Sequence, residues 1–273
     1  MNILVTAGNT QTPIDRVRCL TNIFSGRTGA NIAVRAAERG HTVTLLTSHP
    51  EVLLPDSPNH PPEPSVPATS PTGGEVGSIE KQEISNRGDT LHLPPRGGGR
   101  RSSEARTAGG GELIRIEKYQ TFEDLDSAME REISTGGFDA VIHAAAVNDY
   151  LLAGTFAKVN GELADVSAGK VKGNHEELWL KFRPAPKLVD KIRSDWHFTG
   201  TLVKFKLEVG VGDAELLEIA ERSRVHSHAD WMVANTLEGM HEWAFAGAEP
   251  HGYRRVTRAD LADAVLALIE GES

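Results

Sequence analysis

The hydrophobic and polar positions of this chain follow two alternating patterns, short apolar runs and longer amphipathic segments. Residues 2–6 and 42–46 are apolar runs of the kind that form buried parallel strands. Between them, residues 30–37 place alanine and isoleucine at helical spacing, and Gly40 follows where a left-handed residue would end a helix. The pattern therefore predicts a strand–helix–strand unit with a right-handed crossover.

The same patterns continue along the chain outside residues 49–112. They predict strands at 113–117, 138–147, 201–207 and 230–235, helices at 121–134, 186–194, 213–226 and 258–269, and a hairpin of 243–246 with 253–256. Thr121, with Asp124 three residues later, marks the start of a helix. Residues 151–175 are expected to form a polar loop. The alternation indicates an α/β fold, a doubly wound, mostly parallel, Rossmann-like sheet in a single domain over residues 1–273.

Residues 49–112 differ in composition from the rest of the chain. They are rich in Pro, Ser, Gly and charge, so they cannot bury enough apolar surface to offset the entropy of ordering. We expect a low-complexity, disordered insertion. Its basic residues could dock an anionic partner, although a solvated run is the favoured interpretation; they are Arg96, Arg100, Arg101 and Arg106.

The first loop, residues 7–29, lies where a strand–helix–strand unit binds ligands, beyond the carboxyl end of the first strand. It lacks G-x-G-x-x-G, and Thr47 and Ser48 stand where a dinucleotide site has an acidic residue, so an NAD-type oxidoreductase is disfavoured. The alternative to a binding site is a solvated loop with chance charges. Its polar and glycine residues suit a phosphorylated or carboxylated substrate: Asp15, Arg16, Arg18, Asn22, Ser25, Gly26, Arg27 and Gly29.

Residues 6–29, TAGNTQTPIDRVRCLTNIFSGRTG, resemble the signature of the phosphopantothenate-cysteine ligases, with Phe24 in place of a serine. Three further stretches are similar to motifs of that family: AAAVNDY at 144–150, FKLE at 205–208 and DWMVAN at 230–235. Lys170 and Lys172 preserve part of a K-x-K-K element. The Lys pair that bacterial members carry before VAN is replaced around Arg222 and Arg224.

The resemblance implies ligation of 4'-phosphopantothenate to L-cysteine through an acyl-nucleotide, with ATP or CTP and Mg²⁺, in coenzyme A synthesis. No flavin is expected, the metal ligands are unknown, and the family likeness implies a homodimer. By motif position, Asn22, Arg18 and Lys170 would be catalytic. The residues expected to bind nucleotide or substrate are Asp15, Ser25, Gly26, Gly29, Asn148, Asp149, Lys172, Phe205 and Lys206.

Composition and charge narrow the remaining possibilities. The 39% hydrophobic content supports a globular core, and the net charge of −9 argues against a nucleic-acid partner. The single cysteine, Cys19, excludes an intramolecular disulfide and is interpreted as a small apolar filler rather than a nucleophile. His143 is expected in the sheet, and His226 and His228 exposed at a helix end. No membrane span or leader is evident, so we expect a cytoplasmic protein.

Two other functions remain open from the residues. One is a non-catalytic or repurposed nucleotide-binding protein of the same fold. The other is a short-chain-type NAD(P) reductase, which the missing dinucleotide fingerprint makes the weaker alternative.

Overall fold

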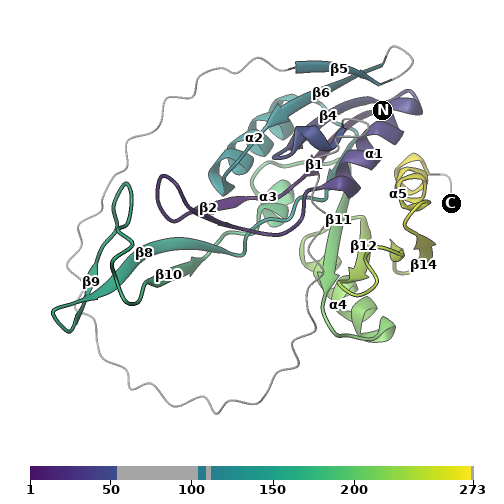
Figure 1. The fold of residues 1–273 in the computed structure, drawn as a ribbon. Helices are drawn as coiled ribbons and strands as arrows, with labels where there is room; N and C mark the ends of the chain where they lie inside the picture. Colours follow the sequence, from purple (N-terminus) through teal and green to yellow (C-terminus); the bar gives the residue numbers. More distant parts are fainter. Residues whose placement is uncertain (54–103, 109–111, 272–273) are drawn as a thin grey trace. The chain divides into compact units, whose positions relative to one another are not determined.

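The computed structural model describes residues 1–53, 104–108 and 112–271, which belong to one compact unit. Nine strands of the described chain form one sheet (Figure 1). Their order is β14 (Gly252–Thr257), β13 (Trp243–Ala248), β12 (Trp231–Thr236), β11 (Thr201–Glu208), β7 (Ala140–His143), β1 (Asn2–Ala7), β4 (Thr42–Thr47), β6 (Glu112–Lys118) and β5 (Glu104–Ala108).

The six strands from β12 to β6 are parallel, and antiparallel strands complete both edges. From β1 the chain builds one side of the sheet through β4 and β6, and then the other side through β7, β11 and β12. The strand order therefore reverses between β1 and β7. Ligands of such sheets bind beyond the carboxyl ends of the strands at this switch point. The predicted doubly wound α/β fold class is confirmed.

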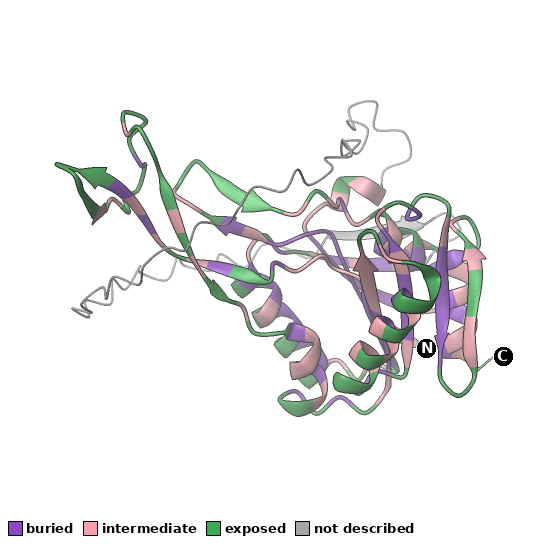
Figure 2. Ribbon diagram, turned by 90° about the horizontal axis from the view of Figure 1, so that it is seen from below, coloured by how far each residue is buried: buried purple, intermediate pink, exposed green. Residues whose placement is uncertain are grey.

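Helices cover both faces of the sheet. One face packs against α1 (Arg27–Glu38) and α5 (Leu261–Glu270), and the other against α2 (Phe122–Thr135), α3 (Leu188–Ser194) and α4 (Asp213–His226). Strand residues alternate between the two cores, so Ile3 and Val5 join α1 while Leu4 joins α2. Burial of each such Ile or Leu side chain stabilises the folded state by about 1.5–3 kcal/mol relative to leaving it exposed. Figure 2 shows this burial in the central strands and on the inward helix faces.

The residues that were predicted to begin and end helices α2 and α1 do so in the structure. Thr121 accepts a hydrogen bond from Asp124 N–H, and the Asp124 carboxylate accepts one from Thr121 N–H, which completes a capping box at α2. Gly40 has φ +86° directly after α1. None of the helices in the described ranges has the length and apolarity needed to cross a membrane.

Residues 151–175 do not form the predicted polar loop, because most of them belong to a second sheet. This sheet, the arm, contains β10 (Trp179–Pro184), β8 (Tyr150–Val159) and β9 (Glu162–Asp165), all antiparallel. Asn160 and Gly161 connect β8 to β9 with φ values of +55° and +85°. Asn-Gly is the preferred pair for such a two-residue hairpin turn, so the sequence carried a signal that the loop prediction missed.

The first loop also contains structure that was not predicted. β2 (Gln11–Pro13) and β3 (Cys19–Thr21) form a short hairpin, and Thr12 Oγ1 donates to Tyr150 O of the arm at 3.4 Å. Cys19 is exposed. Its interpretation as a small apolar filler is wrong, since every residue of β3 is exposed and β3 pairs with β2 alone.

Two predicted boundaries change for clear reasons. β7 ends at His143 instead of Val147, because Gly8, with φ +90°, interrupts the regular ladder, and only an isolated bridge of Asn9 with Ala146 continues the pairing beyond it. Within the expected insertion, Pro50–Leu53 is a 3₁₀ turn and β5 pairs with β6, so these parts are ordered. The rest of the insertion, with Arg96, Arg100 and Arg101, lies outside the described residues.

Candidate functional site

The first loop returns to the carboxyl end of β1 through close backbone packing. Gly26 has φ +82°, and a Cβ there would lie 2.0 Å from the backbone nitrogen of Gly8. A Cβ at Gly29 would lie 2.7 Å from the Cβ of Ala7. Glycine at both positions therefore brings the N-terminus of α1 against the end of β1.

The N-terminus of α1 is open to an anion. Its N-cap residue, Gly26, provides no side-chain cap, and its first turn has no acidic residue. Ser25, just before it, is 8% exposed, and its Oγ has no hydrogen-bond partner. Free N–H groups, the helix dipole and an unused hydroxyl are the donors that a phosphate or carboxylate requires. The predicted residues Ser25, Gly26 and Gly29 thus lie together at the N-terminus of α1.

Asn22 joins the first loop to the segment that follows β7. Its Nδ2 donates to Ala146 O at 3.0 Å, while its backbone oxygen accepts from Asn9 Nδ2 at 2.8 Å. Asn9 Nδ2 also donates to Phe24 O at 2.8 Å. Among the described residues, the second N–H and the side-chain oxygen of Asn22 have no partner, so both are free for a ligand.

The 144–149 segment lies beside the first loop, as predicted for the ends of neighbouring parallel strands. Asn148 is buried, and its Nδ2 donates to Thr10 O at 3.1 Å and to Thr12 Oγ1 at 2.9 Å. Both amide protons of Asn148 are thereby used within the protein. Asp149 is exposed and pairs with Lys187 at 2.5 Å.

The Asp15 carboxylate connects the first loop to the loop that contains Lys170, Val171 and Lys172. Asp15 accepts hydrogen bonds from the Arg18 side chain, at 2.5 Å in the shortest contact, and from Val171 N–H at 3.1 Å. Arg18 in turn donates to Val171 O at 2.8 Å. The Arg18 guanidinium and backbone N–H donors hold the pKa of Asp15 well below its usual range. Lys170 and Lys172 flank buried Val171 and are exposed, without an ion pair to any described residue.

Other predicted residues lie apart from this centre. Phe205 packs on the face of β11 that α1 and α5 cover, whereas Lys206 pairs with Glu208 at 2.8 Å. Arg222 and Arg224 stand around the position where bacterial members of the resembled family carry a Lys pair. Both lie near the end of α4 and pair with Glu218 and Glu221, at 2.9 and 2.6 Å, so they are used within that helix.

Two organising residues were not recognised in the sequence. Asn9 bonds Asn22 and Phe24 as described above, and Tyr119, which is 5% exposed, donates to Ala7 O at 2.7 Å. Burial raises the pKa of Tyr119. Both side chains secure the turn after β1. Asn9 stands in a variable position of the signature and Tyr119 simply follows an expected strand, so no local pattern marks their roles.

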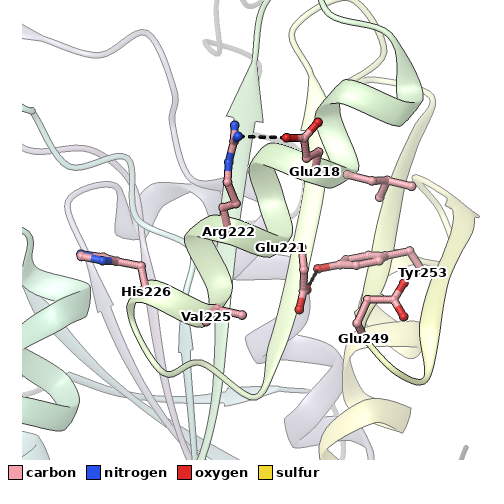
Figure 3. A pocket seen from close by; sticks show the side chains of 8 residues that line it. Glu218, Glu221, Arg222, Val225, His226, Glu249 and Tyr253 are labelled. Atoms are coloured by element: carbon pink, nitrogen blue, oxygen red, sulfur yellow. Dashed lines mark hydrogen bonds and ion pairs between the residues drawn. The ribbon is translucent and has the colours of Figure 1, made fainter.

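A pocket of about 710 Å³ lies elsewhere, between α4 and the turn that joins β13 to β14 (Figure 3). Glu221 and Tyr253 point toward each other in it, with the Tyr253 hydroxyl donating to Glu221 at 2.7 Å. None of the predicted site residues lines this pocket. The switch point, with its free donors, is the better candidate site.

Within the described residues, no group of three or more His, Cys, Asp and Glu side chains could hold a metal ion. Mg²⁺ that acts on nucleotides is held mainly by substrate phosphates and water, with one or two carboxylates from the protein. Asp149 is an exposed carboxylate at the carboxyl edge. The donor set therefore fits an ion that arrives with its nucleotide.

Comparison with known proteins identifies relatives. The family model described as the DNA/pantothenate metabolism flavoprotein C-terminal domain matches residues 1–59 and 110–252. A coenzyme A biosynthesis bifunctional protein of Thermococcus kodakarensis is 28% identical over 236 residues, covering 86% of this chain and 41% of the relative. The Escherichia coli protein of the same name is 47% identical over 58 residues, covering 21% of this chain and 14% of its own. The chain thus spans less than half the length of these relatives.

Solved structures share the fold. The DNA/pantothenate metabolism flavoprotein of Streptococcus pneumoniae has a TM-score of 0.67 at 21% identity, with full coverage of both chains. A Cab2 mutant in complex with phosphopantothenate-cysteine has a TM-score of 0.61 at 12% identity, covering 100% of this chain and 86% of Cab2. At these identities the likeness supports the fold alone.

Proposed function

Because the chain belongs to the DNA/pantothenate metabolism flavoprotein C-terminal domain family, we propose that it joins 4'-phosphopantothenate to L-cysteine in coenzyme A biosynthesis. The observation that carries the proposal is the meeting of Asn22, Ala146 and the open N-terminus of α1 at the switch point. The names of the archaeal and bacterial relatives, and the ligand of the Cab2 structure, support the same pathway and product.

The reaction needs two displacements. The phosphopantothenate carboxylate attacks the α-phosphorus of a nucleoside triphosphate, which forms an acyl–oxygen–phosphorus bond and releases pyrophosphate. The cysteine amine then attacks the acyl carbon, which forms the amide, expels the nucleoside monophosphate and loses a proton. A carboxylate is otherwise a poor acyl donor, so the first step makes the second possible.

The residues at the switch point match the charges of these steps. The free N–H of Asn22 would donate to the acyl-nucleotide, where an oriented donor stabilises developing negative charge. Ser25 and the amides of the α1 N-terminus would hold an anionic group of the same intermediate. Arg18 would keep the loop that carries Lys170 in place through Asp15 and Val171, since it bonds both.

Lys170 and Lys172, which have no ion pair to a described residue, would neutralise the departing pyrophosphate. Mg²⁺ bound with the nucleotide would supply Lewis-acid stabilisation of the same charge. We propose Asp149 as the carboxylate of this chain that reaches the ion or its water. ATP and CTP are both retained as candidate nucleotides, with no bound flavin.

We also propose a homodimer that pairs through the arm. Four apolar side chains of the arm region are largely exposed: Val159 at 42%, Leu163 at 50%, Leu178 at 39% and Trp179 at 51%. The strand register places Leu163 and Trp179 on the same face of the arm, since they pair with Lys158 and Phe156, and exposed apolar side chains that share a face mark an interaction surface. A solution mass measurement tests the dimer, and Trp179→Lys should shift it toward monomer; a wild-type monomer at micromolar concentration would refute it.

The deciding experiment follows pyrophosphate and amide product separately with each nucleotide. Pyrophosphate should form from phosphopantothenate and one nucleotide, and the amide should form only after cysteine is added. Nucleotide binding without pyrophosphate release would instead identify a non-catalytic binding protein. Oxidation of a nicotinamide cofactor in the same mixture would favour the reductase.

A further inference from the structure

A pair of buried polar side chains occupies the switch point, where apolar residues would pack at lower cost. Thr6 of β1 and His143 of β7 are register partners, with exposures of 0% and 9%. Thr6 Oγ1 and His143 Nδ1 are 2.9 Å apart. A buried polar pair needs its hydrogen bonds satisfied, and such pairs serve specific geometry more than stability.

The hydrogen-bond directions in this pair follow from a third group. The backbone N–H of Ala145 donates to Thr6 Oγ1 at 3.2 Å. The hydroxyl proton of Thr6 is then free for His143 Nδ1, which accepts it when that nitrogen is unprotonated. Burial, followed by the charge of Lys204, lowers the pKa of His143 to about 4, so the ring is neutral at pH 7.

The hydrogen bonds of the next residue, Ala146, connect Ala145 to the candidate site. Ala146 N–H donates to Gly8 O at 2.8 Å, and Ala146 O accepts from Thr10 N–H at 3.2 Å and from Asn22 Nδ2 at 3.0 Å. A displacement of Ala145 would therefore move the carbonyl that orients the Asn22 amide. The Thr6–His143 pair contributes to the position of Ala145 through the bond from Ala145 N–H to Thr6 Oγ1, beside the backbone bonds of Ala144 and Ala146.

We propose that His143 is a positioning residue for Asn22, acting through Thr6 and the backbone of Ala145 and Ala146. This inference rests on the proposed ligase function for its kinetic consequence, but its structural link can be measured without turnover. His143→Leu should lower kcat about ten-fold with little change in the KM for nucleotide, since even small misplacement of a catalytic group is costly. His143→Asn, whose Oδ1 replaces Nδ1 as acceptor, should restore most of kcat.

Three measurements test the proposal. In an Asn22→Ala background, His143→Leu should cause almost no further loss of kcat, because both changes remove the same contribution of the Asn22 side-chain amide to kcat. The side-chain amide NMR signals of Asn22 should shift in His143→Leu and return toward their wild-type positions in His143→Asn. Ile142→Val, a packing change in the same strand, serves as the control and should leave these signals in place.

The outcomes separate the proposal from the ligase function. Independent losses in the double variant, or unshifted Asn22 signals in His143→Leu, would overturn the positioning role. If the wild type shows no ligation, the proposed function fails. The NMR signals of Asn22 still show whether His143 positions the Asn22 amide. Should His143→Leu not fold, Thr6→Val replaces it in both measurements, with Thr6→Ser as the variant that restores the hydroxyl.

Discussion

The two ends of the parallel strands differ in how many of their polar groups remain available to a ligand. At the amino edge, Arg193 pairs with Asp230 at 2.7 Å, and Arg224 pairs with Glu221, which also accepts from Tyr253. These charges neutralise one another. At the carboxyl edge, Asn9, Asn22 and Asn148 bond to backbone groups, and ion pairs join only Asp15 to Arg18 and Asp149 to Lys187 among the described residues of the first loop and the 144–149 segment.

Polar groups at the amino edge mainly stabilise the fold, whereas several at the carboxyl edge remain available to bind a ligand. Side chains that bond to the backbone shape the turns after β1 and β7 without neutralising a charge, so donors such as Ser25 Oγ and the α1 amides remain free. Lys170 and Lys172 likewise keep their charges unpaired among the described residues. We therefore expect substitutions at the carboxyl edge to change chemistry and those at the amino edge to change stability.

The largest effect is expected for Asn22→Asp. The change replaces the amide donor by a carboxylate beside an anionic intermediate, and losing one such donor typically costs about 10²–10³-fold in turnover. Pyrophosphate release and amide formation should both be followed. Asn31→Asp, the same change on the exposed side of α1, should be nearly silent. Near-wild-type ligation by the Asn22 variant would show that the active loop is assigned incorrectly.

The pH dependence of the free energy of unfolding should reveal the lowered pKa of His143. Its pKa is about 4 in the folded protein, below the ordinary value of 6.5, so between these pH values the unfolded chain binds a proton that the folded protein does not. The free energy of unfolding should therefore fall as pH drops from about 6.5 to 4, by up to about 3 kcal/mol. Denaturant unfolding of wild type and His143→Asn measures the difference. A difference independent of pH would contradict this.

Lys170→Gln should lower the rate of pyrophosphate formation about ten-fold. One charge-assisted hydrogen bond contributes about 1.5 kcal/mol, which corresponds to that factor. Lys181→Gln is the matched control, because Lys181 of β10 is exposed and has no ion pair within the described part of the chain. If Lys172→Gln showed the loss instead, the pyrophosphate contact would lie two residues further along the loop.

The smallest effect should come from the amino edge. Glu221→Gln weakens the bonds to Arg224 and Tyr253 and should lower the free energy of unfolding by about 1–2 kcal/mol, with turnover unchanged. Glu218→Gln breaks an exposed pair with Arg222 and should cost about 0.5 kcal/mol or less. A loss of turnover in the Glu221 variant would remove the distinction between the two edges.

Most of the elements that the sequence predicted correctly carry a local signal. The apolar runs of β1 and β4, the capping box at Thr121 and the left-handed Gly40 each depend on neighbouring residues, and all were recognised. The arm shows a local signal that was overlooked, since Asn160-Gly161 is a hairpin turn by its own chemistry. The long resemblance in residues 6–29 identified the family because most of its pattern is contiguous.

What periodicity could not supply is the set of contacts between distant segments. Asn22 meets Ala146 across 124 positions, and Arg18 meets the Val171 carbonyl across 153, because the fold brings loops after different strands to one edge. The burial of His143 beside Thr6 depends on the register of β7 against β1. The sequence by itself therefore determined most strands of the nine-stranded sheet, most helix ends and the family. Only the tertiary structure decided which donors remain free at the site, because a hydrogen-bond partner is a property of position in space.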